Sequence, residues 1–259
     1  MEKRSSFQIQ LAVINALARR ELKTRFGQYR LGIVWALLEP LMQMLFFMVM
    51  FHFRGMSGVG GLALPIFLAT GLAPFQYFNR VVNQASGAVS ANRNLFIYRQ
   101  VRVFDAFLVR FLLEAIISFV VLITLIAGTW WAGYDVAVYD SILFLQVYLL
   151  LSFLSFGISL IVGVITTLYP EPAKFVPFLL RPLFFISGTF FSINEMPAVT
   201  HDFLLWNPLL HAFELFRSTL SVGYDSSLVS LNYLRLFTLF ALTLGMLMYR
   251  ANWRKMLTV

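Results

Sequence analysis

Residues able to perform catalysis are few in this chain of 259 residues, which carries three histidines and no cysteine. The lack of cysteine excludes thiolate nucleophiles, thiolate metal sites and disulfides. None of the histidines has a second histidine four residues away, as a helical zinc pair requires. His201 precedes Asp202, and such a pair could serve acyl transfer, so a membrane-embedded acyltransferase is one alternative hypothesis. We predict no catalytic residue and no metal ligand.

The chain also lacks a phosphate-binding loop. Such a loop needs Gly-Lys-Ser/Thr, because backbone N–H groups and the lysine side chain together hold the phosphates. Only one of the four lysines, Lys23, precedes a threonine, and Leu22 stands where the glycine should be. If ATP drives this protein, another chain must bind it.

Polar side chains within apolar stretches are the more informative residues, because each is costly in a bilayer. Several fall within one helical arc that ends near Gln84, and this arc could face water or a polar cargo, or bond to other helices. Two further arginines have no acidic residue near them in sequence, so each must pair with another helix, snorkel or contact an anionic cargo. These residues form the candidate translocation path: Gln76, Asn79, Arg80, Asn83, Arg181 and Arg235.

Three charged residues in apolar stretches suggest pairing or proton transfer. Glu39 precedes Pro40, and at this depth its carboxyl must be protonated or paired, with a structural ion pair favoured over a proton relay. Arg110 and Glu114 are one helical turn apart and could neutralise each other. A secondary carrier driven by protons through Glu39 or Glu114 is therefore a second alternative hypothesis.

Composition identifies the environment of these residues as a membrane. The chain is 59% hydrophobic and 12% charged, with a mean hydropathy of +0.78. Soluble domains are roughly 45–50% apolar and about 25% charged. The net charge of +8 would suit either a nucleic acid or a membrane surface, and the position of the charges decides. They flank the apolar stretches, so we expect contact with membrane lipid and not with nucleic acid.

Six apolar stretches are candidates to cross a bilayer, which takes about 20 residues each. Met196–Leu220 contains two further apolar pieces, broken at Asn207-Pro208 and each too short to cross, which favours a re-entrant or interfacial helical hairpin. Small residues at spacings of three and four in the fourth stretch indicate helix packing: Ser152, Ser155, Ser159, Gly163 and Thr166. The predicted all-α membrane fold has spans at Leu31–Phe53, Leu62–Val82, Ala106–Trp131, Ile142–Leu168, Phe175–Phe191 and Leu228–Tyr249.

The N-terminal segment, residues 1–30, is predicted to form an amphipathic helix on the membrane surface. Its apolar stripe is Phe7, Leu11, Ile14, Ala18 and Leu22, and its basic residues are Lys3, Arg4, Arg19, Arg20, Lys23, Arg25 and Arg30. Lys and Arg gather on the side that would hold both termini, so we predict that this side is cytoplasmic. The chain is then one domain, with a membrane region at 31–250 and a cytoplasmic tail at 251–259.

The loop between the second and third stretches contains a candidate docking site. Asn92 or Asn94 can cap a short helix there. Its apolar surface, flanked by basic residues, could dock a partner protein or anchor the loop at the membrane interface. The residues concerned are Asn92, Arg93, Leu95, Phe96 and Tyr98.

This order of elements is similar to the polysaccharide-export branch of the type 2 ABC transporter permeases. Several strings resemble the capsular polysaccharide export permeases of Gram-negative bacteria, and the resemblance covers essentially the whole chain. The strings are Ala18–Gly27, Tyr29–Pro40, Leu95–Arg102, Leu205–Leu215 and Met256–Thr258.

The resemblance implies a homodimer of permeases at the bacterial inner membrane, each engaging a separate ABC ATPase that binds ATP and Mg²⁺. It implies a lipid-linked acidic polysaccharide as cargo, with O-antigen or teichoic acid as alternative cargoes. It places Asn92, Arg93, Leu95, Phe96 and Tyr98 in the helix that couples to the ATPase. It also implies a periplasmic co-polymerase and an outer-membrane export protein as partners. No cofactor is expected in this chain.

Overall fold

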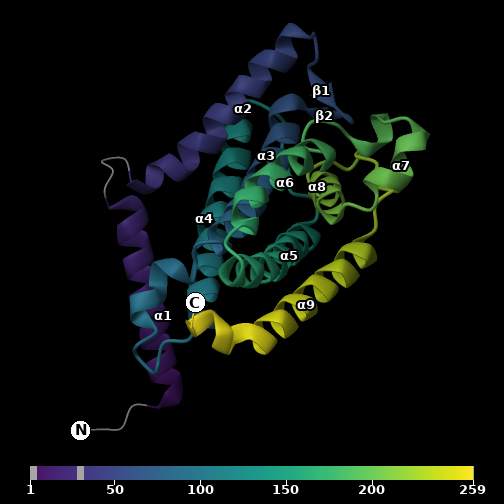
Figure 1. Cartoon of the computed structure of the whole chain (residues 1–259). Helices are drawn as coiled ribbons and strands as arrows, with labels where there is room; N and C mark the ends of the chain where they lie inside the picture. The colour runs from purple at the N-terminus through teal and green to yellow at the C-terminus, as the bar shows by residue number, and fades with distance from the viewer. Residues whose placement is uncertain (1–4, 28–31, 259) are drawn as a thin grey trace.

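A computed structural model of the chain describes residues 5–27 and 32–258, which fold into a largely helical protein (Figure 1). The α-helices are α1 (Ser6–Phe26), α2 (Trp35–Phe53), α3 (Leu64–Ala85), α4 (Val103–Trp131), α5 (Ser141–Leu168), α6 (Pro172–Ile186), α7 (Ala198–Leu204), α8 (Pro208–Ser218) and α9 (Leu231–Thr258). Short 3-10 helices are η1 (Gly32–Val34), η2 (Ser90–Leu95) and η3 (Ile193–Glu195). The predicted helical character is therefore confirmed.

A short antiparallel β-hairpin between α2 and α3 departs from the all-helical prediction. It pairs β1 (Gly58–Val59) with β2 (Leu62–Ala63). Gly60 and Gly61 form the turn with φ of 60° and 80°, a conformation that a two-residue hairpin turn requires and that glycine adopts without strain. The Glu195 carboxylate accepts a hydrogen bond of 2.7 Å from the Gly60 N–H. This bond ties the turn to η3.

Four of the described helices, α2, α4, α5 and α9, are long and apolar enough to cross a membrane. α3 has 22 residues and carries the predicted polar arc, while α6 has 15 residues, fewer than the roughly 20 needed to cross. α6 ends at Ile186 because the chain turns at Gly188, where φ is 73°. α9 continues to Thr258, so no change of element marks the predicted boundary at 251. Leu31, the predicted start of the first span, lies outside the described residues.

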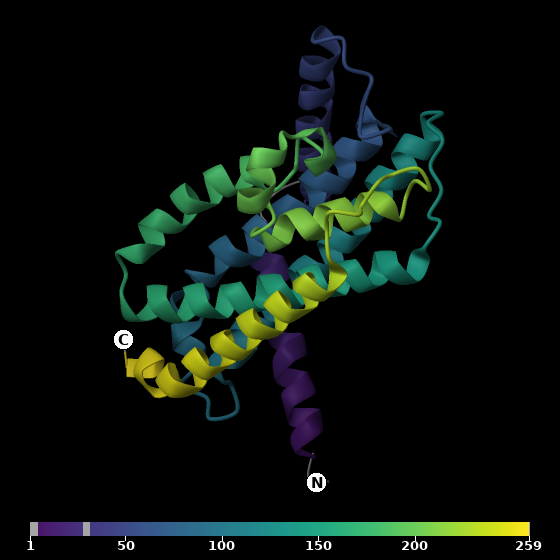
Figure 2. The ribbon, with the colours of Figure 1, turned by 90° about the vertical axis from the view of Figure 1, so that its right-hand side faces the viewer.

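The most extensive packing between two helices joins α5 and α9, which lie side by side (Figure 2). Glycines allow this close approach: a Cβ at Gly157 would lie 2.7 Å from the Leu242 nitrogen, and one at Gly245 only 2.6 Å from the Gly157 oxygen. The small residues that we assigned to packing on α5 are all buried: Ser152, Ser155, Ser159, Gly163 and Thr166. That prediction is confirmed.

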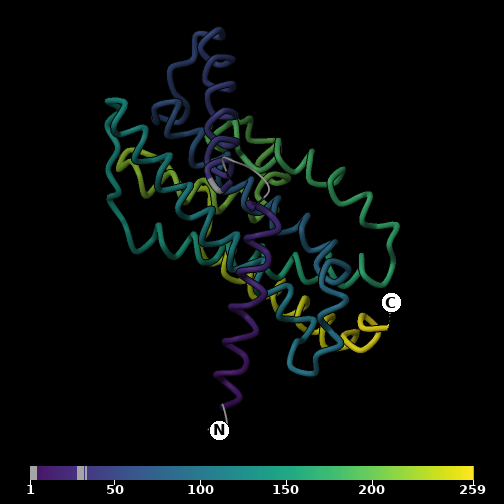
Figure 3. Tube along the Cα trace, turned by 90° about the vertical axis from the view of Figure 1, so that its left-hand side faces the viewer, coloured from purple at the N-terminus to yellow at the C-terminus, as the bar shows by residue number. Residues whose placement is uncertain are grey.

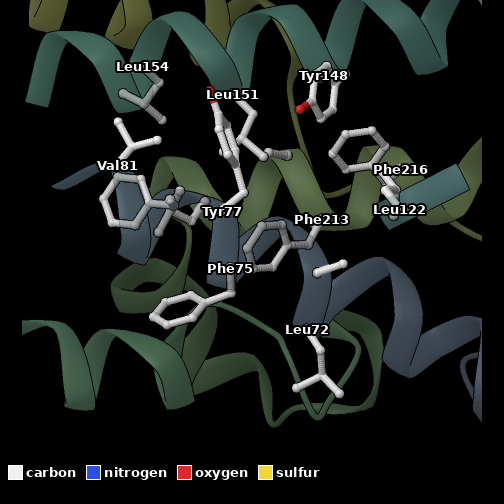
Figure 4. Packing of buried hydrophobic residues seen from close by; sticks show 14 of the residues in the cluster. Leu72, Phe75, Tyr77, Val81, Leu122, Tyr148, Leu151, Leu154, Phe213 and Phe216 are labelled. Carbon is white, nitrogen blue, oxygen red and sulfur yellow. The ribbon is translucent and has the colours of Figure 1, made fainter. Parts of the chain in front are cut away.

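The core is centred on α3, which packs against α4 and α5, and on α8, which packs against α3, α5 and α9 (Figure 4). Tyr77 of α3 and Phe213 and Phe216 of α8 are completely buried among leucines of the neighbouring helices. The chain breaks between α7 and α8 at the predicted place, where the Asn207 side chain accepts a hydrogen bond from the Leu209 N–H. α8 is thus enclosed by the longer helices around it.

α1 lies along one edge of the molecule, with its N-terminal end extending away from the other helices (Figures 1 and 3). Ser5 and Gln8 form a reciprocal capping box at its start. Val13 and Leu17 are buried against α4, whereas Phe7 and Leu11 of the predicted stripe remain exposed. The exposed side chains of Phe7 and Leu11 therefore form an apolar surface that is available to lipid. The predicted basic residues Lys3, Arg4 and Arg30 lie outside the described residues.

Candidate translocation groove and coupling surface

A groove of about 400 Å³ opens between α2, α3 and α6 and has polar and aromatic walls. Its polar lining consists of Glu39, Gln43, Gln76, Asn79, Asn83 and Arg181. Gln76 donates a hydrogen bond to Gln43, and Asn83 donates one to Asn79. Four of the six predicted path residues therefore share one groove. Because polar groups are costly in hydrocarbon, such a groove is suited to water or a polar ligand.

The aromatic wall of the groove is formed by phenylalanines of α3 and α6. The rings of Phe75 and Phe184 lie 4.8 Å apart between centroids, and Phe185 lies 5.3 Å from Phe184. Aromatic faces can contact the C–H faces of a sugar without requiring one fixed register. The groove therefore combines hydrogen-bonding groups with surfaces suited to a glycan.

The predicted polar arc of α3 divides between two neighbours. Gln76, Asn79 and Asn83 face the groove, whereas Arg80 and Gln84 face α4. Arg80 Nε lies 3.3 Å from Glu114 Oε2, and its Nη1 lies 3.6 Å from Glu39 Oε2. The favoured ion-pair interpretation of Glu39 is confirmed. Arg80 is therefore held by acids from two other helices, both distant from it in sequence.

The predicted pairing of Arg110 with Glu114 is wrong. Arg110 Nε lies 3.0 Å from Glu21 Oε1 of α1, and its Nη1 donates to the Gln84 carbonyl at 2.7 Å. Glu114 instead pairs with Arg25 of α1 and with Arg80. Both side chains of α4 contact α1 and α3, so each finds its partners on these two helices and not along α4.

Arg235 lies on α9 and does not line the groove. Its Nη1 donates to Asn232 Oδ1 at 3.0 Å, and its Nη2 lies 2.6 Å from the Gln146 side-chain oxygen in the amide orientation that satisfies both groups. Arg181 lies in the groove, and among the described residues no carboxylate lies within ion-pair distance of it. The structure therefore separates two arginines that the sequence treats alike.

The predicted coupling segment forms η2 and the turn that follows it. The prediction that Asn92 or Asn94 caps a helix is wrong, because η2 begins at Ser90 and both residues lie within it. Asn92 is buried, donating to the Ala88 carbonyl at 2.8 Å and accepting from Arg20 of α1 at 2.9 Å. Its role is to join the segment to α1.

Ile97 is the most exposed apolar residue of this segment, at 82% of its full exposure, and the sequence interpretation omitted it. Tyr98 beside it is 59% exposed, while Leu95 and Phe96 are half-buried. The basic Arg93 is exposed as predicted. The sequence does not show which apolar side chain of a turn is exposed. The exposure of Ile97 therefore became evident only from the conformation of the turn.

A second groove, of about 580 Å³, lies between α1 and residues 95–101. Its walls include Val13 and Leu17 of α1 and Leu95, Tyr98 and Val101 of the turn. Arg20 also donates to the Ala91 carbonyl at 2.9 Å. α1 and the turn therefore form one continuous surface.

An acid–base cluster in α8 was missed by the sequence interpretation. Arg217 and Glu214 are both completely buried and lie 2.9 Å apart. Arg217 also donates to the Gly188 carbonyl at 2.7 Å and lies 3.6 Å from the centroid of the Phe67 ring. Tyr224 donates to Glu214 at 2.7 Å, and burial raises its pKa, which keeps the hydroxyl protonated. The signal for this pair in the sequence was an acidic and a basic residue three positions apart in an apolar helix.

Of the two residues of the acyltransferase hypothesis, His201 has a structural partner. The His201 Nε2 lies 3.0 Å from the Met196 carbonyl oxygen, and Asp202 is exposed on α7. Among the residues that the structure describes, no group of His, Asp and Glu could hold a metal ion.

Long apolar helices around a polar groove, with an exposed apolar turn beside a basic helix, define a membrane protein of the transporter class. The chain belongs to the ABC-2 type transporter family, whose model matches residues 12–221.

Similar proteins cover almost the whole chain. The polysialic acid transport protein KpsM of Escherichia coli is 40% identical over 255 residues, which are 98% of this chain and 99% of that protein. The capsule polysaccharide export inner-membrane protein BexB of Haemophilus influenzae is 32% identical, covering 95% of this chain and 93% of BexB. The protein CtrC of Neisseria meningitidis, with the same description as BexB, is 32% identical, covering 82% of this chain and 80% of CtrC. The resemblance to capsular polysaccharide export permeases is confirmed.

Proposed function

We propose that this chain is the inner-membrane permease subunit of an ATP-driven exporter that moves capsular polysaccharide from the cytoplasm to the periplasm. The family and the near full-length similarity to capsule export proteins support the class of cargo. The polar and aromatic groove between α2, α3 and α6 is the structural observation that carries the proposal. Because the chain has no phosphate-binding loop, a separate ABC ATPase binds ATP and Mg²⁺.

The groove is open along one side, and a second copy of the chain would close it. α2 and α6 flank the groove and expose Phe46, Val49, Phe178 and Phe185, apolar side chains that suit either lipid or a second subunit. A twofold pair places the same surface on both subunits, so two grooves would face each other across the axis. A homodimer would thereby form a complete glycan path, with each chain contributing half of it.

The proposed topology has six spans, with α3 and α6 completing the set of four apolar helices, and both termini in the cytoplasm. The concentration of Lys and Arg on that side supports the orientation. α7 and α8 then form a re-entrant hairpin that enters from the periplasmic side. The burial of α8 among α3, α5 and α9 favours this arrangement over an interfacial hairpin.

The cargo is proposed to be acidic and lipid-linked, and capsule export proteins of the periplasm and outer membrane to be further partners. Arg181 in the groove is suited to a carboxylate-bearing sugar. O-antigen or teichoic acid would suit the same groove. A proton-driven carrier is less well supported, because Glu39 and Glu114 are both engaged by Arg80.

We expect the purified chain to hydrolyse no ATP alone, and ATP-dependent export to appear only when its partner ABC ATPase is co-reconstituted. Proteoliposomes loaded with ATP and capsule polysaccharide would measure this, with an ATPase lacking its catalytic glutamate as the control. Hydrolysis by the chain alone, or export driven by a proton gradient without ATP, would contradict the proposal.

Replacing Arg181 by Gln is expected to lower surface capsule by about tenfold at normal protein level, since each lost charge-assisted contact is worth roughly 1.5–3 kcal/mol. Arg235→Gln is the matched control, because this arginine lies outside the groove on α9. Capsule and permease are both quantified in cells that express each variant. Full capsule with Arg181→Gln, or equal loss with both variants, would argue against cargo contact in the groove.

A further inference from the structure

Glu114 of α4 is the most enclosed carboxylate among those that link α1 to the groove. It is completely buried and is contacted by Arg25 of α1 and by Arg80 of α3. Gln84 of α3 also donates to it at 2.6 Å. A carboxylate at this depth needs such partners, because an unpaired buried charge is strongly destabilising.

The charges around Glu114 form one balanced network across four helices. Arg80 continues the network from Glu114 to Glu39 of α2, and Glu21 of α1 pairs with Arg110 of α4. The network thus holds three carboxylates, Glu21, Glu39 and Glu114, and three guanidinium groups, Arg25, Arg80 and Arg110. It begins beside the coupling segment and ends at the groove wall.

The network is incompletely hydrogen-bonded in the structure. Arg80 Nε, Arg110 Nε and Glu114 Oε2 are buried without a well-aligned hydrogen-bond partner among the described residues. Such atoms carry a desolvation cost that another arrangement of the same side chains could relieve. An element with two arrangements of similar free energy is what coupling between distant sites requires.

The remaining link joins α1 to the turn that we propose contacts the ATPase. Arg20 of α1 bonds to both Asn92 and the Ala91 carbonyl, so displacement of the coupling segment displaces α1. Arg25 lies one and a half turns further along the same helix and contacts Glu114 directly. Movement at the cytoplasmic surface therefore reaches Glu114 through a single helix.

We infer that Glu114 is a positioning residue that transmits movement of α1 to the groove. When Arg25 withdraws, Arg80 becomes the main partner of Glu114 and its contact with Glu39 weakens, which loosens α2 at the groove wall while Gln76 and Gln43 still join α2 to α3. When Arg25 returns, Arg80 is shared again and the groove wall is restored. This inference rests on the proposed function of the groove. The contacts that support it all lie within this chain.

Glu114→Gln is expected to leave ATPase binding and ATP hydrolysis of the reconstituted complex within about twofold of wild type while lowering export per ATP by about tenfold, a typical coupling between sites. Adding Arg25→Gln should cause little further loss, because both substitutions break one link. Lys23→Gln is the matched control, since Lys23 is exposed on α1 and makes no ion pair with the network among the described residues. Unchanged export per ATP in Glu114→Gln would overturn the inference.

A second measurement needs no ATPase and separates this inference from the proposed function. The chain has no cysteine, so Met42→Cys on α2 and Val120→Cys on α4, both exposed, can carry spin labels specifically. Arg25→Gln should broaden the distance distribution between these labels, and Lys23→Gln should leave it unchanged. Identical distributions in wild type and Arg25→Gln would overturn transmission through Glu114, whatever the ATPase experiments show.

Discussion

Replacing Ile97 and Tyr98 together by Asp is expected to abolish assembly with the ATPase while membrane insertion persists. Ile97 is 82% and Tyr98 59% exposed in the isolated chain, so the substitutions remove little internal packing. Within an apolar docking groove each unpaired charge would cost about 2–5 kcal/mol, and every 1.4 kcal/mol weakens binding roughly tenfold. Co-purification of the ATPase with the tagged permease from membranes measures the effect, and capsule export should fail with it.

Two control variants identify the cause of that loss. Arg93→Gln changes an exposed charge of the same segment, and we expect it to weaken assembly far less than the double variant because it places no charge in the docking groove. Phe96→Asp places a charge on a half-buried side chain that packs against the core, so it should lower the amount of permease itself. Normal co-purification of the ATPase with the Ile97→Asp, Tyr98→Asp variant would show that this turn is not the docking surface.

Removing the Glu214 carboxylate is expected to destabilise the protein far more than the loss of an exposed ion pair would. Glu214→Ala leaves the completely buried guanidinium of Arg217 without its carboxylate, and breaking a buried pair in this way costs about 3–5 kcal/mol. Tyr224 and the Ile193 N–H lose their acceptor as well. We expect loss of most permease from the membrane and a lowered midpoint of thermal unfolding in detergent.

The double variant Glu214→Leu, Arg217→Met tests the reason for that instability. It removes both charges and keeps apolar volume, so the protein should recover part of the stability lost in Glu214→Ala. Glu195→Gln is the surface control, because among the described residues the carboxylate of this exposed acid bonds only to the Gly60 N–H of the hairpin turn. If Glu214→Ala unfolds at the wild-type temperature, the buried pair does not hold α8 in place.

The environment and the helices of this protein follow from local sequence. Apolar stretches long enough to cross a bilayer, and the basic residues beside them, can be recognised within short segments of the sequence. Their length matches the thickness of a bilayer, so they directly predict spanning helices. Helix and strand boundaries that depend on the conformation of a turn were harder to predict from the sequence. The end of α6 at Ile186 depends on the positive φ of Gly188, and the hairpin turn is joined to η3 because the Gly60 N–H donates to Glu195, which is distant in sequence.

The candidate groove was partly predictable because three of its residues share one face of α3. Helical spacing alone places Gln76, Asn79 and Asn83 together. That same spacing included Arg80, and only the packing of α4 against α3 turned Arg80 toward Glu114. The addition of Arg181 from α6 required the tertiary structure, since nothing local links it to α3.

The sequence by itself determined the membrane environment, most of the helices, the break at Asn207 and, through its resemblance, the family. Only the tertiary structure decided which charges pair: Arg110 with Glu21, Glu114 with Arg25 and Arg80, and Arg217 with Glu214. It also decided that Ile97 projects from the coupling turn. Hydropathy and helix formation act over a few neighbouring residues, whereas a long charged side chain can reach any helix packed beside its own.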